Sequence, residues 1–291
     1  MAVTDKQMRL LIIDGHAFAY RAFYAIRGLT SPTGQPTNAI YGFINMLAKL
    51  EAQVLPTHSV VVWDGGLDEG RVEELDDYKA QRDPMPDEME VQLDAMVEYL
   101  EAEGWASVCD DGIEADDRIG QLTRRAEAEG FEVAIASSDK DFFQLINDRV
   151  KMWNPADKSG KPMDAEAVVA KTGVRPEQIV DWLSLVGDTV DNIPGVPGVG
   201  VKTAASLLNE FGSVDELYRN LAKVSRDKLR EALAAAEADV RRNQSLVALK
   251  LDLPGEPELD ELRRGFQDSA RLEKLYEEWG FKTLLKDLRE A

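Results

Sequence analysis

The residues best able to do chemistry in this chain are carboxylates. Glu114, Asp116 and Asp117 lie within four residues at the expected start of a helix, where the positive end of the helix dipole favours negative charge. That preference alone would explain the run as a solvated helix start. Six more aspartates, however, lie at or near the ends of apolar stretches or in a later pair: Asp14, Asp64, Asp139, Asp141, Asp188 and Asp191.

A site that gathered these side chains would need cations. Each pair of carboxylates about 4 Å apart costs about 4 kcal/mol at an effective dielectric of 20. Ligation by oxygen alone is typical of Mg²⁺ or Mn²⁺. One Mg²⁺ cannot use so many carboxylates, whereas two ions about 3.5–4 Å apart would, and such a pair clamps the attacking and leaving oxygens of a phosphodiester. For any one aspartate by itself, a helix cap or a surface charge remains the alternative.

A second stretch, residues 193–208, has the composition of a phosphate-binding turn. Gly195, Gly198 and Gly200 allow the backbone to approach a phosphate, and the amides at the start of the next helix can bind it. Lys202 would add a charge-assisted contact, and Thr203 follows it. The spacing predicts a helix-hairpin-helix motif at about residues 179–211, with an ordinary turn between two helices as the alternative.

The elements that must position these residues alternate between strand and helix. Apolar runs predict strands at 9–13, 59–63, 105–109, 131–136 and 149–153. Apolar spacing predicts helices that begin at Asn38 and that cover 88–103 and 114–129. This alternation is typical of an α/β fold with a mostly parallel central sheet flanked by helices. Ligands of such sheets bind at the carboxyl ends of the strands, where Asp14, Asp64 and Asp139 fall.

Two regions follow from the pattern. Residues 1–172 form the predicted α/β region, which contains most of the carboxylates, and residues 173–291 form a predicted helical region, which contains the glycine-rich turn. The pattern becomes helical from about residue 164, with no further clear strand. Residues 66–87 are polar and show no helical spacing of apolar side chains.

The composition limits the class of protein and its compartment. Apolar residues make up 44% of the 291, as in globular proteins, and no apolar run approaches the roughly 20 residues that span a bilayer. The polar first nine residues indicate no signal peptide. A single cysteine, Cys109, excludes an internal disulfide framework and suits a reducing cytoplasm.

The net charge is the one feature that argues against a nucleic-acid partner. With 34 basic and 54 acidic residues, the formal net charge is −20. A protein that binds phosphates normally carries a basic footprint. Two interpretations follow: either the partner is not a polyanion, or the acidic excess is divided between a cation-filled site and a solvated surface, with the basic residues gathered locally.

Taken together, these residues resemble the bacterial and phage 5′-nucleases, a family that includes flap endonucleases and the N-terminal nuclease domain of bacterial DNA polymerase I. The resemblance covers nearly the whole chain and implies a PIN-like fold with a helix-hairpin-helix of the H3TH type. It rests on these stretches: Asp14-Gly15-His16, Tyr20-Arg21-Ala22-Phe23, Ser31-Pro32-Thr33-Gly34, Tyr41-Gly42-Phe43, Tyr78-Lys79-Ala80-Gln81-Arg82, Glu114-Ala115-Asp116-Asp117, Asp139-Lys140-Asp141, Val186-Gly187-Asp188 and Asp191-Asn192-Ile193-Pro194-Gly195.

The family implies a Mg²⁺- or Mn²⁺-dependent 5′-3′ exonuclease and flap endonuclease that acts on DNA with a 5′ flap, a nick or a free 5′ end. Two-metal hydrolysis would leave a 5′-phosphate and a 3′-hydroxyl. By this resemblance, the carboxylates that hold or support the first metal are Asp14, Asp64, Glu114, Asp116 and Asp139. Those of the second metal region are Asp141, Asp188 and Asp191, and Asp117 contacts a metal or one of its ligands.

The resemblance also implies roles for basic and aromatic residues. Lys79, Arg82 and Arg21 would draw in the scissile phosphate and neutralise developing charge. Tyr78 would stack on a base of the frayed end. The hairpin at 195–202 would grip the duplex backbone, with a bound K⁺ as in relatives.

The segment at about 66–103 corresponds to the arch through which a single-stranded 5′ end passes in relatives; we call it the arch. The family usually shows an aromatic-Arg-His pattern there, whereas Arg71 lies between Gly70 and Val72, and 68–77 is strongly acidic. We expect a nucleoid-associated monomer that works beside a separate DNA polymerase. Both a free-standing enzyme and an excised domain fit the sequence, which encodes no polymerase.

Three other functions fit parts of the pattern. A non-catalytic DNA-binding module would use the hairpin and leave the acidic site vestigial. A phosphohydrolase for small esters would use an acidic sheet edge but has no use for the hairpin or for Tyr78, Lys79 and Arg82. A PIN-type ribonuclease is a nearer cousin, so RNA and DNA flaps need to be compared.

Overall fold

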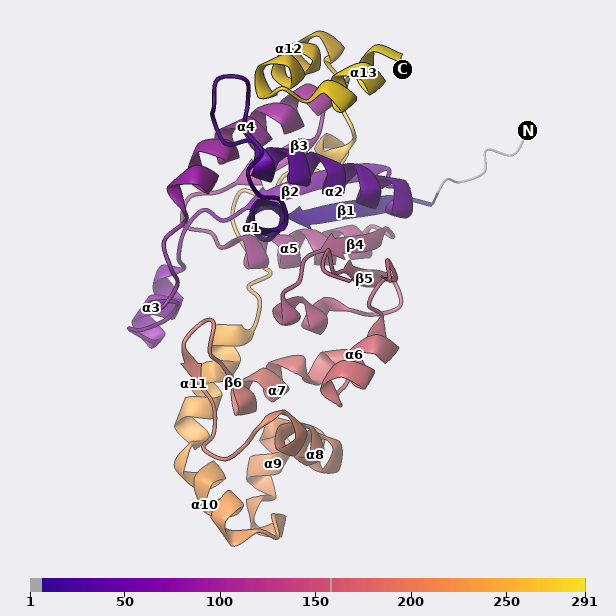
Figure 1. Ribbon diagram of the computed structural model, residues 1–291. Helices are drawn as coiled ribbons and strands as arrows, with labels where there is room; N and C mark the ends of the chain where they lie inside the picture. The colour runs from indigo at the N-terminus through magenta and orange to yellow at the C-terminus, as the bar shows by residue number, and fades with distance from the viewer. Residues whose placement is uncertain (1–6, 158, 291) are drawn as a thin grey trace, which may run out of the picture.

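The computed structural model describes residues 7–157 and 159–290. The strands of its main sheet are parallel and lie in the order β3-β2-β1-β4-β5 (Figure 1). Because β2 and β4 pair with opposite sides of β1, the sheet is doubly wound, with its switch point between β1 and β4. The bounds of the strands are β1 (Arg9–Asp14), β2 (His58–Trp63), β3 (Ala106–Cys109), β4 (Glu132–Ala136) and β5 (Val150–Trp153).

Helices cover both faces of this sheet. Leu11 and Ile13 of β1 pack in a core with α1, α2 and α4, whereas Leu10 and Ile12 pack in a second core with α5 and η1. All four side chains are fully buried, as expected for a parallel strand covered on both sides. The helices of this half are α1 (Gly15–Ala25), α2 (Asn38–Val54), α3 (Glu69–Glu74), α4 (Asp87–Glu103), α5 (Ala115–Ala128) and the 3₁₀ helix η1 (Lys140–Leu145).

The next part of the chain is mainly helical and lies below the sheet in Figure 1. Its core is continuous with that of the α5 face of the sheet. Its helices are α6 (Ala165–Thr172), η2 (Pro176–Gln178), α7 (Ile179–Val186), α8 (Val201–Phe211), α9 (Val214–Arg219), η3 (Leu221–Lys223), α10 (Asp227–Ala235) and α11 (Glu237–Val247).

The chain then returns to the α/β half. Residues 248–263, which we call the strap, run along α5 and include η4 (Leu259–Leu262). Side chains from one face of α5 hold the strap: Arg118 and Gln121 donate to the carbonyl oxygens of Pro254 and Leu253. Beyond the strap, α12 (Ser269–Trp279) and α13 (Lys282–Glu290) pack on the α4 side of the sheet (Figure 1).

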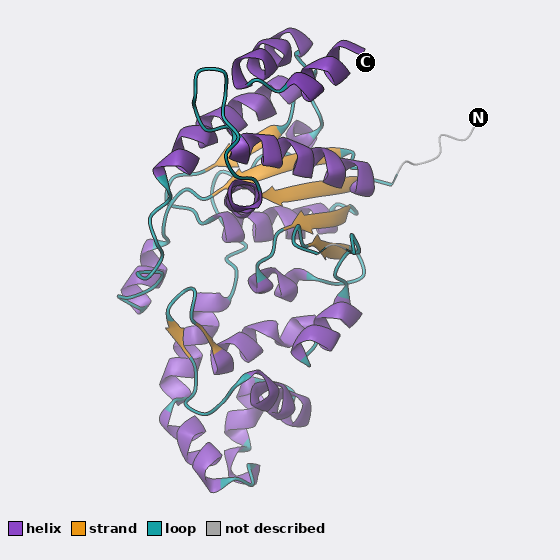
Figure 2. Cartoon of the chain, in the orientation of Figure 1, coloured by secondary structure: helices purple, strands orange, loops and turns teal. Residues whose placement is uncertain are grey.

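Most predicted elements are confirmed. Each predicted strand of the main sheet matches an observed strand to within one residue at either end, and so do the predicted helices at 88–103 and 114–129. The pattern was wrong in the helical part, where β6 (Gly187–Asp188) and β7 (Ile193–Pro194) form a small antiparallel pair (Figure 2). Strands of two residues are too short to show an alternation of apolar and polar residues, so the sequence pattern does not predict them.

The arch also contains an element that periodicity does not show. Its first helix, α3, has six residues and is capped by Asp68, whose side chain accepts a hydrogen bond from the N–H of Arg71. Within the described residues, no helix has both the length and the apolar character needed to cross a membrane. The prediction about a signal peptide falls partly on residues 1–6, which lie outside the described part of the chain.

Candidate metal and nucleic-acid site

The sheet brings the strand-end aspartates to its switch point. Asp14 is the last residue of β1, Asp64 directly follows β2, and Asp139 follows β4 after two serines. Because these three parallel strands are neighbours, their carboxyl ends lie at one edge of the sheet. That edge, next to the reversal of strand order, is the usual ligand position in a doubly wound sheet.

Asp14 is held firmly at this edge. It is 7% exposed, and its two oxygens accept from the Ala17 N–H at 3.1 Å and from the Ser137 hydroxyl at 2.7 Å. Burial raises the pKa of Asp14 to about 6, and repulsion from Asp139 and Asp64 adds to the rise. The hydrogen bonds oppose this rise without cancelling it. The negative charge of Asp14 is therefore only partly compensated by the protein, although its side chain is fixed in position.

Asp116 reaches the same edge from the first turn of α5. Burial raises its pKa well above the ordinary value for an aspartate, and repulsion from Asp139 and Asp14 contributes next. Four of the five carboxylates predicted for the first metal region, Asp14, Asp64, Asp116 and Asp139, therefore lie close enough to repel one another, as one cluster.

A second cluster consists of Asp141, Asp188 and Asp191. One oxygen from each lies within 4.8 Å of the other two, and all three side chains are buried. Asp141 comes from η1, whereas Asp188 belongs to β6 and Asp191 to the turn before β7. Burial, followed by repulsion from Asp139 and Asp191, raises the pKa of Asp141 well above its ordinary range. Asp139 thus lies between the two clusters and joins them.

Basic side chains border this second cluster. Lys140 pairs with Asp188 at 2.7 Å, and Arg82 pairs with Asp191 at 2.8 Å. Arg82 retains 42% of its side-chain exposure and is therefore accessible to a phosphate. Arg21, on α1, is exposed as well.

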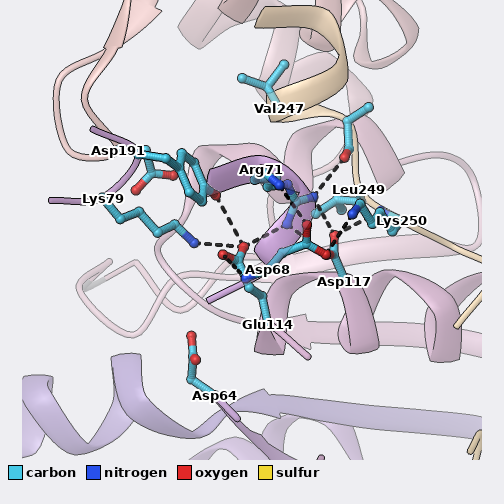
Figure 3. Close-up of polar contacts among 12 residues, drawn as sticks. Asp64, Asp68, Arg71, Lys79, Glu114, Asp117, Asp191, Val247, Leu249 and Lys250 are labelled. Carbon is cyan, nitrogen blue, oxygen red and sulfur yellow. Dashed lines mark hydrogen bonds and ion pairs between the residues drawn. The ribbon is translucent and has the colours of Figure 1, made fainter. Parts of the chain in front are cut away.

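The remaining predicted carboxylates, Glu114 and Asp117, meet a buried arginine (Figure 3). Arg71 pairs with Glu114 at 2.7 Å and with both oxygens of Asp117 at 2.7 and 2.8 Å. Glu114 also accepts from Lys79 at 2.8 Å and from the Tyr78 hydroxyl at 3.2 Å. These two carboxylates are thus compensated by protein donors, unlike Asp14, Asp116 and Asp141.

Two expectations about the arch need correction. The Tyr78 ring is only 4% exposed and packs in the core of the α5 face, so in this conformation it cannot stack on a base. Lys79 is 5% exposed and points at Glu114 rather than to solvent (Figure 3). Its backbone is left-handed (φ 54°), held by an N–H donated to the Asp191 carbonyl at 3.0 Å. The sequence motif showed their chemistry but not that they would be buried.

The predicted hairpin lies between α7 and α8. Val196 and Val199 are buried and anchor it, and the Val196 N–H donates to the Leu185 carbonyl at 2.9 Å. Gly198, Gly200 and Lys202 are exposed, Thr203 is partly exposed, and Gly195 packs closely against the end of α7. Because β6 and β7 precede the hairpin directly, the same turn that presents the glycines also positions Asp188 and Asp191.

Sequence reasoning gave no role to several residues that shape the site. Ser137 bonds Asp14, Lys140 pairs with Asp188, and the His16 ring accepts the N–H of Asp64 at 3.1 Å. The sequence around Arg71 does not indicate that this side chain is buried. The available signal is local: Ser137 directly follows a strand, His16 comes two residues after one, Lys140 lies between two aspartates, and Arg71 is the one basic residue in an acidic stretch.

The donor set fits hard divalent cations. All of the candidate ligands are carboxylates, which suits Mg²⁺, Mn²⁺ and Ca²⁺ better than softer metals. Within the described residues, Oδ1 of Asp141 is buried without a hydrogen-bond partner. A buried carboxylate oxygen without a donor is costly, and a cation at the second cluster would satisfy it.

A doubly wound sheet with an acidic switch point, joined to a helix-hairpin-helix, defines a nuclease of PIN-like architecture. Two family models match consecutive parts of the chain. The 5′-3′ exonuclease N-terminal resolvase-like domain matches residues 9–173, and the 5′-3′ exonuclease C-terminal SAM fold matches residues 174–270. The chain belongs to the 5′-3′ exonuclease family.

Relatives of two lengths match. The 5′-3′ exonuclease of Aquifex aeolicus is 39% identical over 96% of this chain and 94% of its own length. DNA polymerase I of Bacillus caldotenax is 39% identical, and that of Thermus thermophilus 38%, over 96% and 99% of this chain. The chain spans about a third of these two polymerases, 32% and 35% of their lengths.

Solved structures share the fold. The T5 5′-exonuclease with bound zinc ions has a TM-score of 0.67 at 22% identity, over 97% of this chain and 98% of that one. The bacteriophage T5 flap endonuclease in a pseudo-enzyme-product complex with DNA and metal ions has a TM-score of 0.68 at 21% identity, with the same coverage. The catalytic core of Rad2 with a DNA substrate has a TM-score of 0.63 at 18% identity, over 97% and 91%.

Proposed function

We propose that this protein hydrolyses phosphodiesters at 5′ flaps, nicks and free 5′ ends of DNA, using two Mg²⁺ or Mn²⁺ ions at the sheet edge. The observation that carries the proposal is the joint cluster at the switch point. Carboxylates from three neighbouring strand ends and from the start of α5 lie near enough to one another for repulsion to raise the pKa values of two of them. Asp139 also raises the pKa of Asp141, which lies within 4.8 Å of Asp188 and Asp191. Family membership and the T5 complex with DNA and metal ions support the same reaction class.

The carboxylates fall into two groups: proposed metal ligands and carboxylates that protein donors already engage. We assign Asp14, Asp64, Asp116 and Asp139 to the first ion, and Asp141, Asp188 and Asp191 to the second. Glu114 and Asp117 support the site instead, because Arg71 and neighbouring donors already engage them. Divalent ions bound there would lower the pKa of the attacking water and neutralise the phosphate.

Two basic residues of the arch, Arg82 and Lys79, contribute differently to the reaction. Arg82 is exposed at the rim and pairs with Asp191, so it can exchange that carboxylate for the scissile phosphate and stabilise the charge that develops there. Lys79 remains cationic, since Glu114 and Asp191 raise its pKa although burial opposes them. It therefore keeps positive charge beside the acidic site while lying out of reach of solvent.

The hairpin binds the duplex next to the site. The exposed Gly198 and Gly200 let a phosphate approach the backbone, and Lys202 offers an accessible ammonium. A K⁺ ion bound at this hairpin is part of the proposal. We further propose that the protein acts in the cytoplasm as a monomer, on DNA that a polymerase extends.

The test is product length on a 5′-flap duplex with Mg²⁺, with the 5′ end either free or blocked. Cleavage of both substrates at the flap junction shows endonuclease action, whereas loss of cleavage on blocking shows exonuclease action alone. The Asp139→Asn variant should lose at least about 100-fold in kcat, because its carboxylate adjoins both clusters. Unchanged cleavage by this variant would contradict the two-ion assignment. An RNA flap and a small phosphomonoester, run in parallel, test the two remaining enzymatic alternatives.

A further inference from the structure

Arg71 is the meeting point of three parts of the chain that are distant in sequence. It belongs to α3, at the start of the arch, and is 4% exposed. Its guanidinium contacts Glu114 and Asp117 at the start of α5 and donates to the Ala248 carbonyl of the strap at 3.0 Å (Figure 3). One side chain therefore joins the arch, the acidic site and the strap.

A second set of contacts reinforces this junction. Lys250 of the strap pairs with Asp68, the residue that caps α3, at 2.6 Å. The backbone N–H of Lys250 also donates to Asp117 at 2.8 Å. Both oxygens of Asp117 are therefore fixed, one by two donors and the other by one. The strap and α3 clamp this carboxylate between them.

The contacts on Glu114 are one-sided. Its Oε2 accepts from Arg71, Lys79 and Tyr78 at 2.7, 2.8 and 3.2 Å. Among the described residues, its Oε1 accepts only from the Asp68 N–H, at 3.4 Å. Three donors on one oxygen set the orientation of the whole carboxylate and leave the other oxygen weakly engaged.

We propose that Arg71 is a positioning residue: it orients Glu114 and Asp117 beside the metal cluster and makes that orientation depend on docking of the arch and the strap. The inference rests on the proposed nuclease function. Side chains that bond to metal-site carboxylates typically change metal affinity or activity by about 10–100-fold when they are removed. A planar guanidinium suits this role because it can pair with two carboxylates in fixed directions, whereas an ammonium cannot.

The competing explanation is that Arg71 is only a counter-charge for two buried carboxylates. The two explanations predict opposite changes in metal affinity for Arg71→Met. If charge is all that matters, removing a positive group tightens Mn²⁺ binding. If Arg71 positions the carboxylates, Mn²⁺ binding weakens by about tenfold or more. Calorimetric titration of the full chain with Mn²⁺, without DNA, measures the sign directly, and tighter binding overturns the proposal.

Kinetics on a 5′-flap duplex supply the second readout. We expect Arg71→Met to lower kcat by about 10–100-fold with KM for DNA changed by less than about threefold, since Arg71 is buried and does not reach DNA. Arg71→Lys keeps the charge and should recover part of kcat. If Arg71→Met does not fold, Arg71→Lys provides the test instead. Wild-type kcat in folded Arg71→Met would overturn the proposal, and so would full wild-type kcat and Mn²⁺ affinity in Arg71→Lys.

Arg125 provides a matched control, because its side chain contacts the same strap. It lies on α5, donates to the Pro257 carbonyl at 3.2 Å and pairs with Glu258 at 2.6 Å. Arg125→Met should loosen the far end of the strap and leave kcat and Mn²⁺ affinity unchanged. Equal losses in the Arg71 and Arg125 variants would show that strap docking alone matters, which overturns the positioning role.

The failure of this proposal and the failure of the nuclease function are distinguishable. If the wild-type chain cleaves no flap substrate, the nuclease proposal fails. The Mn²⁺ titration, together with the rate at which a protease cuts residues 66–82, still tests Arg71. If the protease cuts Arg71→Met at least about tenfold faster than Arg125→Met, the result supports the proposal that Arg71 anchors the arch. Equal rates count against this proposal.

Discussion

Replacing Asp141 by asparagine should stabilise the metal-free protein and weaken its response to metal. Asp141 lies within 4.8 Å of both Asp188 and Asp191, oxygen to oxygen, and one of its own oxygens has no donor among the described residues. Without a cation, its charge is therefore a source of repulsion. With a cation, the same charge is a ligand. The sign of the effect on thermal stability should depend on which state is measured.

The magnitude follows from the geometry. Two carboxylates 4.8 Å apart repel by about 3.5 kcal/mol at an effective dielectric of 20. Lys140 and Arg82 already pair with Asp188 and Asp191, which reduces this repulsion, and burial raises the pKa of Asp141 above its ordinary range. We therefore expect a net gain of about 1–2 kcal/mol for Asp141→Asn in EDTA, or about 2–6 °C in Tm for a chain of this size.

The assay is a set of thermal melts in EDTA and in a series of Mn²⁺ concentrations. Stabilisation by a ligand grows as the logarithm of the ligand concentration divided by Kd. If Asp141→Asn weakens Mn²⁺ binding tenfold, the stabilisation by saturating Mn²⁺ falls by about 1.4 kcal/mol. Asp148→Asn is the control, because Asp148 is exposed and precedes β5, at the opposite edge of the sheet. A lower Tm of Asp141→Asn in EDTA, or an undiminished response to Mn²⁺, would refute the reasoning.

Three further predictions test other parts of the site. Because burial raises the pKa of Asp14 to about 6 from an unfolded value of 3.8, the folded state binds the proton more tightly. Its contribution is present below pH 3.8 and is lost as the pH rises through 6, so metal-free unfolding free energy should fall by about 3 kcal/mol across that window. Denaturant titrations from pH 4 to 7 measure it, and a flat profile counts against the buried assignment. Lys202→Ala should weaken duplex binding and reduce its salt slope by about one phosphate contact; an unchanged slope would remove the hairpin from the interface. Gly195→Ala should cost at least about 2 kcal/mol in chemical denaturation, since a Cβ there would lie 2.0 Å from the Val186 carbonyl oxygen. Gly200→Ala, which meets nothing within 4 Å, should cost less than about 1 kcal/mol, and equal losses would contradict the packing argument.

Local sequence patterns were sufficient to predict the strands of the sheet and the aspartates at one of its edges. Runs such as Leu10 to Ile13 are apolar throughout because both faces of a parallel strand are buried. An aspartate after such a run must lie at the carboxyl end of its strand. The grouping of Asp14, Asp64 and Asp139 at one edge follows from the α/β alternation alone. That they ligate metal stays a prediction.

Local patterns could not show how the arch packs. Tyr78 and Lys79 carry functional groups that also occur at DNA interfaces, and nothing in their spacing indicates that they are buried against Glu114. Burial depends on which distant segment covers a side chain. The strap docks on α5 from more than 100 residues away in sequence. Leu249, Leu251 and Leu253 alternate with polar residues, but this pattern does not indicate which segment the strap covers.

The strands, the carboxylate chemistry and the glycine turn can be predicted from the amino-acid sequence, since each depends on residues within a few positions of one another. How the carboxylates are compensated depends on the folded chain. Arg71 lies 43 residues from Glu114 and 46 from Asp117, and its pairing with them requires α3, α5 and the strap to converge. Charge compensation depends on distance in space, and distance in space is a property of the folded chain.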